Sequence, residues 1–378
     1  MNWHYLEPVD VLVLRANKLF GGPGSYGESL VPPWPSAAAG AIRSSILVRD
    51  GVDLAAFASC KTTHSTLGSP AEPGMFSVRA FHLARRQGDG YEALYAPPAD
   101  LLISKTDGKD IEVHRLIPHP LGQGIESSMP TDKLPILAQT GRGKPDSCWW
   151  LTEAAYADYL AGKTPKPGQM VKTDQLWSLD ERVGIGLEAE RRRARDGQLF
   201  TVQAVAFHEG IGFLAATDGD GLAGETLLRF GGDGRAARCQ PVRGYRPPAA
   251  NLQAILDAGR CRIVLAGPGL FPDGWRLPGM AEDGEFELAG VKGRVVAAAV
   301  DRPEVISGWD LARRQPKTAQ RTAPTGSVYW IEGLQASPEA LGKLAKRGLW
   351  PEEGYDAQRR AEGFNRFDYA FIEENGYV

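Results

Sequence analysis

The sequence has few of the residue patterns that mark metal centres. Its four cysteines stand apart without a C-x-x-C pair, and its six histidines include no H-x-x-x-H pair, which argues against a zinc site. The carboxylates Asp110 and Glu112 are too isolated to suggest a two-metal site. We therefore expect neither a metal nor a cofactor, and the scattered cysteines fit a reducing compartment.

Long apolar runs and a strong net charge are also missing. No run reaches the length of a membrane span, and the start, Met1-Asn2-Trp3-His4, lacks the basic and apolar regions of a signal peptide. These features predict a cytoplasmic protein without a membrane partner. The formal net charge of −3 does not mark a nucleic-acid binder, so such a function must rest on local clusters of cations.

The chain is long and is rich in glycine and proline. Its 378 residues exceed one ordinary hydrophobic core and favour two domains. Its 45 glycines and 27 prolines predict many loops and turns.

The most distinctive stretch runs from Arg182 to Phe207. Alternate residues from Phe200 to Ala206 are apolar, as in a strand with one buried face, and Asp196-Gly197 ahead of them is a turn signal. Between the two expected strands lie four arginines: Arg191, Arg192, Arg193 and Arg195. A hairpin would expose these cations to an anionic partner, although a charged loop that only keeps a sheet edge soluble has the same pattern.

A second candidate binding element is the glycine-rich loop Gly231-Gly232-Asp233-Gly234-Arg235. Its glycines permit positive φ and a close approach of a ligand to the main chain. Successive N–H groups in such a loop can form an anion-binding nest, with Arg235 beside it. A plain hairpin turn would explain the same glycines.

The order of expected elements predicts the fold. Residues 5–14 are typical of a central strand, and residues 37–48 of a helix that Ser36 caps and Asp50-Gly51 ends. The hairpin, the glycine loop and a strand at 236–242 complete a βαββαβ pattern, which is that of a ferredoxin-like, RRM-like domain.

The pattern recurs in the second half of the chain. There we expect strands at 262–266, 293–300, 326–331 and 367–372, and helices at 251–257 and 338–346. The prediction is an α+β protein of two tandem ferredoxin-like (RRM-like) domains with large insertions and glycine-rich loops. The N-terminal domain would span 1–247, with an insertion at about 52–180, and the C-terminal domain 248–378.

Several motifs occur in a fixed order along the chain. They are Glu7-Pro8-Val9-Asp10, Pro32-Pro33-Trp34-Pro35-Ser36 leading into Gly40-Ala41-Ile42-Arg43, Val183-Gly184-Ile185-Gly186 with Gly197–Val202, the Gly231–Arg235 loop, Gly267–Trp275, Ser307–Ala312 and Pro316–Trp330. This set resembles the RAMP subunit of type III-B CRISPR (Cmr) effector complexes that holds the 5′ handle of the CRISPR RNA (crRNA). Two positions depart from the RAMP pattern: Gln203 stands where Glu is frequent, and Asn365 where a second glycine-rich loop usually has Gly.

The resemblance implies a non-catalytic, crRNA-binding subunit of an RNA-guided interference complex. Such a subunit clamps the repeat-derived 5′ handle, docks the large polymerase-like subunit and contacts a neighbouring backbone RAMP subunit. Single-stranded RNA requires cations for its phosphates, glycines for close approach and flat side chains for stacking.

Candidate RNA-binding residues follow from these requirements. The cations and glycines are Arg43, Arg191, Arg192, Arg193, Arg195, Gly231, Gly232, Gly234, Arg235, Arg313, Arg314, Lys317 and Arg321. The aromatic candidates for stacking are Tyr26, Trp34, Trp275 and Trp309. For Arg43 a structural ion pair is an equal alternative, and for each aromatic a place in the core or an interface is an alternative.

Catalysis is the competing hypothesis. Some RAMP proteins cleave RNA with a histidine or tyrosine, and here His114 and His119 would be the candidate general acid or base. No lysine or nucleophile is spaced beside them, so surface or hydrogen-bonded loop histidines are the favoured interpretation. The alternative function is therefore a metal-independent endoribonuclease that processes CRISPR precursor RNA.

Overall fold

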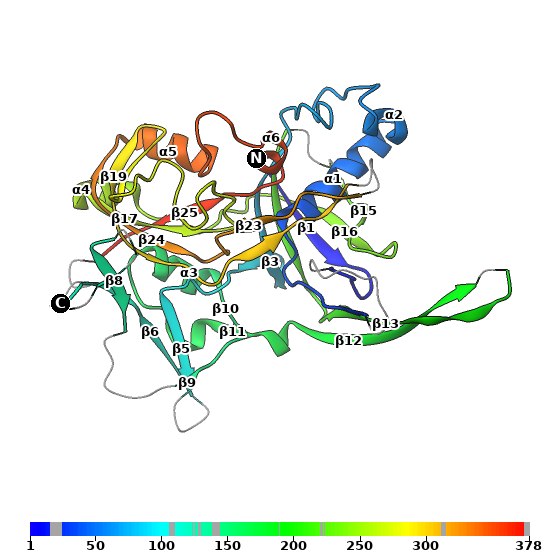
Figure 1. Cartoon of the computed structure of the whole chain (residues 1–378), viewed down its shortest axis with the longest axis horizontal. Helices are drawn as coiled ribbons and strands as arrows, with labels where there is room; N and C mark the ends of the chain where they lie inside the picture. The colour runs from blue at the N-terminus through cyan, green and yellow to red at the C-terminus, as the bar shows by residue number, and fades with distance from the viewer. Residues whose placement is uncertain are drawn as a thin grey trace. The chain divides into compact units, whose positions relative to one another are not determined.

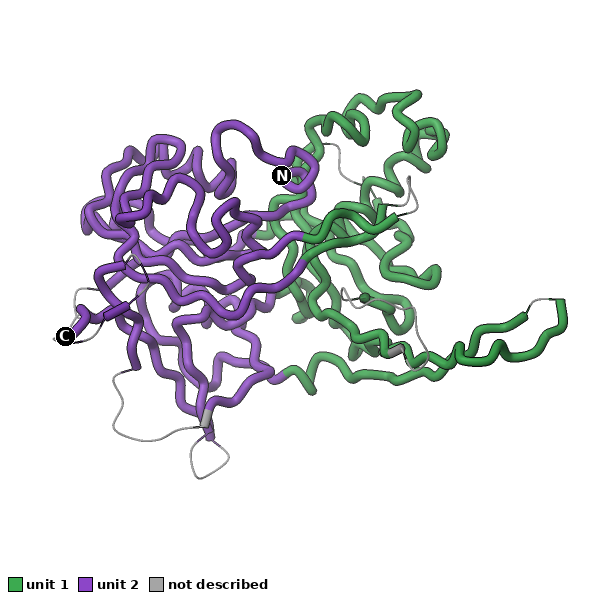
Figure 2. Tube along the Cα trace, viewed as in Figure 1, with its two compact units in different colours: residues 1–92, 173–245, 306–319 green, residues 93–172, 246–305, 320–378 purple. Residues whose placement is uncertain are grey.

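The computed structural model describes residues 1–15, 25–105, 110–122, 124, 126–127, 129, 131–137, 144–188, 190–219, 222, 224–310 and 315–373. The protein is α+β, with many strands and few helices (Figure 1). The chain divides into two compact units (Figure 2). Unit 1 comprises 1–92, 173–245 and 306–319, and unit 2 comprises 93–172, 246–305 and 320–378. The domain boundaries expected from the sequence and the ferredoxin-like topology stay predictions.

Unit 1 is built on a six-stranded sheet of order β15-β16-β1-β14-β3-β4. Its strands are β1 (Asn2–Pro8), β3 (Ser77–Gln87), β4 (Gly90–Leu94), β14 (Ile211–Asp218), β15 (Thr226–Arg229) and β16 (Ala236–Val242). β1 pairs antiparallel with both β14 and β16, and its Tyr5 and Leu6 are fully buried. The expected strand at 236–242 is confirmed.

The apolar run at 5–14 is not one strand, so that prediction was wrong. β1 ends at Pro8, and Leu12 then exchanges backbone hydrogen bonds with Val205 in a different sheet. Both parts of the run are buried, in two separate places, and hydrophobic periodicity does not distinguish this from a single long strand.

Helix α1 (Pro35–Arg49) presents Ala38, Ile42 and Ile46 to the core. Its N-cap is Trp34, without a side-chain hydrogen bond, and not Ser36 as expected. Proline at the first helical position lacks the N–H that a cap would satisfy, so the helix begins earlier than the Ser36 signal. It ends as expected at Asp50, followed by Gly51 at φ 66°.

The expected hairpin is present as β12 (Trp177–Glu188) and β13 (Arg193–Phe207), and β2 (Ser25–Gly27) pairs parallel to β13. Its tip lies at Arg191-Arg192, whose N–H groups both donate to the Glu188 carbonyl. Gly197, at φ 72°, lies inside β13, near the register shift between Ile185 and Leu187. The turn expected at Asp196-Gly197 is therefore wrong, because the glycine accommodates an irregular strand.

Unit 2 is built on a five-stranded sheet of order β18-β19-β24-β17-β25. Its strands are β17 (Arg260–Leu265), β18 (Glu285–Leu288), β19 (Val291–Ala299), β24 (Val328–Gln335) and β25 (Phe367–Ala370), and its neighbouring helices are α4 (Leu252–Ala258) and α5 (Pro338–Arg347). A buried cluster that includes Ile263, Tyr329, Ile331 and Leu344 forms the core. All the elements expected in this half are present, with shifts of a few residues at their ends.

The remaining elements are short. They are α2 (Leu54–Ala58), β5 (Leu101–Lys105), β6 (Ile111–Arg115), β7 (Ile117–Pro120), β8 (Lys133–Ile136), β9 (Lys144–Pro145), β10 (Trp149–Leu151), α3 (Glu153–Leu160), η1 (Pro167–Gln169), β11 (Met170–Lys172), η2 (Thr173–Gln175), β20 (Glu304–Ile306), β21 (Trp309–Asp310), β22 (Gln315–Pro316), β23 (Gln320–Thr322) and α6 (Ala357–Ala361). None of the described helices combines the length and the apolar character needed to cross a membrane.

A buried ionic network lies inside unit 2. Arg262 Nη1 donates to Asp100 Oδ2 over 2.7 Å, and Tyr159 Oη donates to Asp100 Oδ1 over the same distance. The guanidinium also lies 4.3 Å from the centroid of the Tyr159 ring. Asp100 and Arg262 are essentially inaccessible to solvent, so β17, α3 and the segment before β5 depend on a fully paired charge.

Candidate nucleic-acid interface

The hairpin tip carries the arginines that the sequence singled out, and all four are exposed. Arg193 forms a two-point ion pair with Glu188, with N–O distances of 2.8 and 3.1 Å. Arg191, Arg192 and Arg195 have no ion pair within the described part of the chain. Three of the four cations are thus available to an anion, and the distal half of the hairpin extends away from the rest of unit 1 (Figure 1).

The Val-Gly-Ile-Gly motif of β12 has a packing explanation. Gly184 lies opposite Phe200, and a Cβ added to Gly184 would come within 2.4 Å of the Phe200 ring. A Cβ on Gly186 would collide with the side chain of Gln198. The two glycines therefore let β13 side chains lie across the backbone of β12.

The hairpin also exposes an apolar face that we did not identify from the sequence. Val183, Ile185, Leu187 and Leu199 are each at least half exposed. The alternation of Val183, Ile185 and Leu187 was the available signal, but alternation predicts one apolar face without telling whether that face is covered.

A hydrogen-bonded network surrounds Tyr26, one of the stacking candidates. Tyr26 Oη donates to Glu181 Oε1 over 2.7 Å and accepts from Gln203 Nε2 over 2.9 Å. Gln203 Oε1 accepts in turn from the Ser29 N–H. The bond to Glu181 is the main cause of a raised Tyr26 pKa. Gln203, which departs from the RAMP pattern, thus orients a partly exposed ring.

The glycine loop between β15 and β16 has the expected backbone conformation. Gly231 and Gly234 have φ values of 88° and 69°, and a Cβ on Gly231 would lie 3.1 Å from the Val13 carbonyl oxygen. The Gly232 N–H donates to that same carbonyl, and the Arg235 N–H donates to Gly232. Two N–H groups of the loop are therefore already bonded to carbonyl oxygens of the protein. Fewer N–H groups remain for the anion-binding nest that the sequence predicts.

Two cations near these elements have partners in unit 1. Arg235 pairs with the exposed Asp10 carboxylate, an interaction that RNA phosphates would have to replace. Arg43 is half-buried on α1, and its guanidinium carbon lies 5.3 Å from the centroid of the Phe76 ring. Packing therefore accounts for part of the role of Arg43.

The second cation group is divided by the fold. Trp309 and Lys317 belong to unit 1 and Arg321 to unit 2, while Arg313 and Arg314 lie outside the described residues. Trp309 is 56% exposed on β21. Lys317 is half-buried. Its N–H donates a hydrogen bond to the Gly308 carbonyl, and its carbonyl accepts one from the Ser307 hydroxyl.

The other stacking candidates are less accessible. Trp34 is half-buried at the start of α1. Trp275 is also half-buried, packs against the unit 2 core, and accepts a hydrogen bond from Tyr329 Oη at its carbonyl. Trp309 and Tyr26 are thus the more exposed of the four aromatics.

Each of the two candidate histidines lies close to one polar group. His114 Nε2 lies 3.2 Å from Glu112 Oε2, and His119 Nδ1 lies 2.9 Å from the carbonyl oxygen of Pro120. Among the residues that the structure describes, no group of three His, Cys, Asp or Glu side chains is placed to hold a metal.

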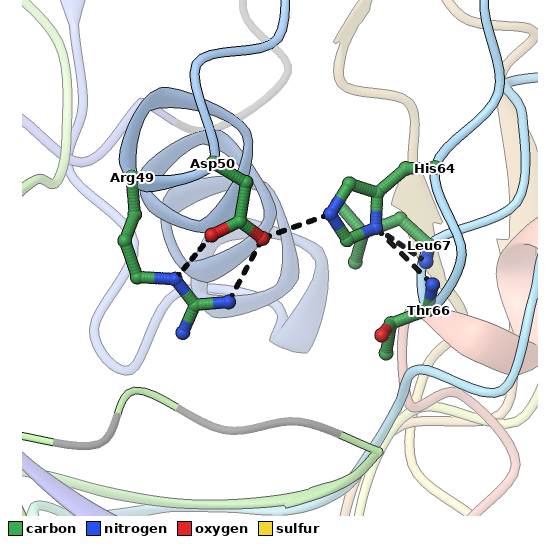
Figure 3. Close-up of polar contacts among 5 residues, drawn as sticks. All are labelled: Arg49, Asp50, His64, Thr66 and Leu67. Carbon is green, nitrogen blue, oxygen red and sulfur yellow. Dashed lines mark hydrogen bonds and ion pairs between the residues drawn. The ribbon is translucent and has the colours of Figure 1, made fainter.

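A different histidine, His64, has a structural role (Figure 3). Its Nε2 donates to Asp50 Oδ2 over 2.9 Å, and its Nδ1 accepts from the N–H groups of Thr66 and Leu67. Hydrogen bonds from Arg49 and then His64 hold the Asp50 pKa well below its usual value. This cluster fixes a loop to the C-terminal end of α1.

Comparisons with known proteins identify a family model and similar solved structures. The family model described as CRISPR-associated protein (Cas_Cmr3) matches residues 4–366. A chain from a cryo-EM structure of the type III-B Cmr-beta complex bound to cognate target RNA superposes with a TM-score of 0.51, at 14% identity, over 97% of this chain and 96% of that one. A chain from the same complex bound to target RNA and AMPPnP gives a TM-score of 0.50, at 16% identity, over 97% and 95%. No curated protein matches the sequence.

Proposed function

Because the chain belongs to the Cas_Cmr3 family of CRISPR-associated proteins, we propose that it is a non-catalytic, RNA-binding subunit of a type III-B Cmr complex. In that role it clamps the 5′ handle of the crRNA, docks the large polymerase-like subunit and contacts a neighbouring backbone RAMP subunit. We also propose that the two central sheets belong to two tandem ferredoxin-like domains.

The observation that carries the RNA-binding role is the hairpin tip. Arg191, Arg192 and Arg195 project from a long two-stranded support without an ion pair to any described residue. Three exposed, unneutralised guanidinium groups favour an anionic polymer, because an intramolecular function would have supplied carboxylates as it does for Arg193.

The glycine loop with Arg235 is the second proposed contact. The loop lies between two strands of the unit 1 sheet. The side chain of Arg235 forms an ion pair with Asp10, which is itself exposed. A phosphate that binds Arg235 would displace a carboxylate, so this contact should be weaker than those at the hairpin tip.

The test measures the salt dependence of RNA binding. Full-length protein is titrated with labelled single-stranded repeat RNA over a range of salt concentrations, and log Kd is plotted against log salt. Arg191, Arg192 and Arg195 are replaced by Ala together. Each lost phosphate contact lowers the slope by about 0.7, so the triple variant should lose roughly 2.

A charge-matched control keeps the experiment specific. Arg302, Lys343 and Lys346 are exposed cations of unit 2 outside the candidate site, and their triple Ala variant removes the same charge. Its slope should equal that of the natural protein. An unchanged slope in the hairpin variant, or an equal loss in the control, would remove the hairpin from the RNA site.

A further inference from the structure

Unit 2 contains a recess of about 580 Å³ whose residues take no part in the proposed RNA contacts. We call it the unit 2 recess. Leu270 and Phe271 are buried members of its lining. The residues that form its rim are exposed or half-buried, and they are Pro272, Gln320, Arg321, Pro351, Tyr355 and Asp356. A hollow of this volume is in the range of binding sites.

The rim carries one cation and one anion. Arg321 and Asp356 are both exposed, and neither forms an ion pair within the part of the chain that the structure describes. Asp356 uses Oδ1 to accept from the Arg359 N–H at the start of α6, and its other oxygen faces no described cation. A nucleic acid brings negative charge only, so the carboxylate disfavours it here. Charge complementarity favours a ligand with charges of both signs, which is a protein surface.

Tyr355 gives the rim an aromatic side chain in a fixed position. The Arg360 guanidinium carbon lies 5.0 Å from the centroid of the Tyr355 ring, a cation–π contact that holds the ring. Pro272 and Pro351 beside it have no side-chain rotamers to lose. Tyrosine and arginine are enriched among the residues that contribute most to protein–protein binding, and a rim that is already ordered loses little entropy when a partner binds.

Asn365 holds the two loops of the recess together. Its side chain is fully buried. Oδ1 accepts from the Leu270 N–H over 2.6 Å, and Nδ2 donates to the Leu349 carbonyl over 2.7 Å. The loop that carries Phe271 is thereby tied to the segment that leads to Pro351. A glycine, which is usual at this position of the RAMP pattern, would lack both side-chain bonds, so the asparagine fixes the recess in advance of binding.

The position of the recess in the chain indicates which protein it receives. The hairpin tip and the glycine loop, which are the proposed RNA contacts, both belong to unit 1. A backbone subunit that follows the same RNA would lie beside those contacts. The partner that remains for unit 2 is the large polymerase-like subunit.

We propose that the unit 2 recess receives an apolar side chain of the large polymerase-like subunit, with a carboxylate of that subunit on Arg321 and a cation on Asp356. The inference rests on the subunit docking proposed above and gives that docking a position on the protein.

The test measures two affinities of each variant. Full-length protein is titrated with the purified large polymerase-like subunit by biolayer interferometry, and the same preparation is titrated with labelled single-stranded repeat RNA. Tyr355→Ala should raise the Kd for the large subunit at least about fivefold, because it removes the central aromatic side chain of the rim. Its Kd for RNA should not change, which also shows that the variant is folded.

Charge reversal tests the complementarity. Arg321→Glu and Asp356→Lys each place a like charge opposite the partner, so each should raise the Kd for the large subunit roughly threefold or more. The matched controls Arg302→Glu and Glu282→Lys make the same changes of charge at exposed positions of unit 2 outside the recess. They should leave that Kd unchanged.

The inference is overturned if Tyr355→Ala and both charge reversals bind the large subunit as the natural protein does, or if the natural protein does not bind it at all. Weaker RNA binding by Tyr355→Ala would place the recess in the RNA site, and a loss of affinity for the backbone subunit instead of the large one would assign it to another partner; either result contradicts the inference. A natural protein that binds the large subunit but no RNA would contradict the RNA-binding role alone.

Discussion

At the scale of single residues, neighbours in one charge cluster have different roles. Arg193 is neutralised by Glu188, five residues earlier on the opposite strand, whereas Arg191, Arg192 and Arg195 are not paired in the described chain. The sequence predicted an exposed cluster of cations, because four arginines so close together cannot all be buried in a hydrophobic core. It could not distinguish the paired member, because that depends on the hairpin register.

Gln203 offers a direct test at this scale. Tyr26 has one phenolic proton, which it donates to Glu181, and it accepts from Gln203. Gln203→Glu would replace that donor by a second acceptor at a buried position, and we expect the free energy of unfolding to fall by about 1–3 kcal/mol. Urea denaturation at pH 7 measures this loss.

The double variant Gln203→Glu with Glu181→Gln should recover most of that stability, since the tyrosine could then donate to the new carboxylate. Gln198→Glu, on an exposed part of the same strand, serves as the control and should be close to neutral. A double variant no more stable than the single one would contradict the assigned network.

Asp368 predicts a pH dependence of stability. It accepts a hydrogen bond from Tyr156 Oη over 2.8 Å, and burial raises its pKa from 3.8 to about 6. The folded protein thus holds this proton more tightly than the unfolded chain. The contribution of Asp368 to stability is greatest below about pH 4, declines between about pH 4 and pH 6, and is lost above that.

Asp368→Asn removes the titration. Relative to the natural protein, this variant should gain stability as the pH rises from about 4 to about 7, by at most about 3 kcal/mol, and the difference should be constant above about pH 7. Urea unfolding at pH 4.5, 5.5 and 7 measures the difference. A difference that does not vary over this range would show that Asp368 has an ordinary pKa.

At the scale of elements, the sequence predicted best where one strand or helix has one buried face. The strand at 236–242 and helix α5 follow their patterns within a residue. The run at 5–14 failed because two buried segments of different sheets are adjacent in sequence. The glycine loop was foreseen, but its partner Asp10 lies 225 residues from Arg235, and no local pattern connects them.

The buried pair of Asp100 and Arg262 joins elements that are far apart in the chain. Arg262→Met should cost about 3–5 kcal/mol, because it leaves Asp100 buried without its cation. The double variant Arg262→Met with Asp100→Asn should recover part of this loss, since no uncompensated charge then remains. Urea unfolding of the natural protein and the two variants provides the comparison, and equal stability of the single and double variants would contradict a coupled pair.

At the scale of the whole molecule, the proposed function is RNA binding without RNA cleavage. Labelled repeat RNA incubated with full-length protein in EDTA should shift in a native gel and stay intact. His114→Ala and His119→Ala should bind as the natural protein does. Cleavage that disappears in either variant would instead establish the endoribonuclease alternative.

The most direct test is a map of the assembled complex at side-chain resolution around the 5′ end of the guide RNA. We predict phosphates of that end within hydrogen-bond distance of at least two of Arg191, Arg192, Arg195 and Arg235. A map in which the hairpin tip and the glycine loop are covered by protein, and the 5′ end lies on another subunit, would contradict the account.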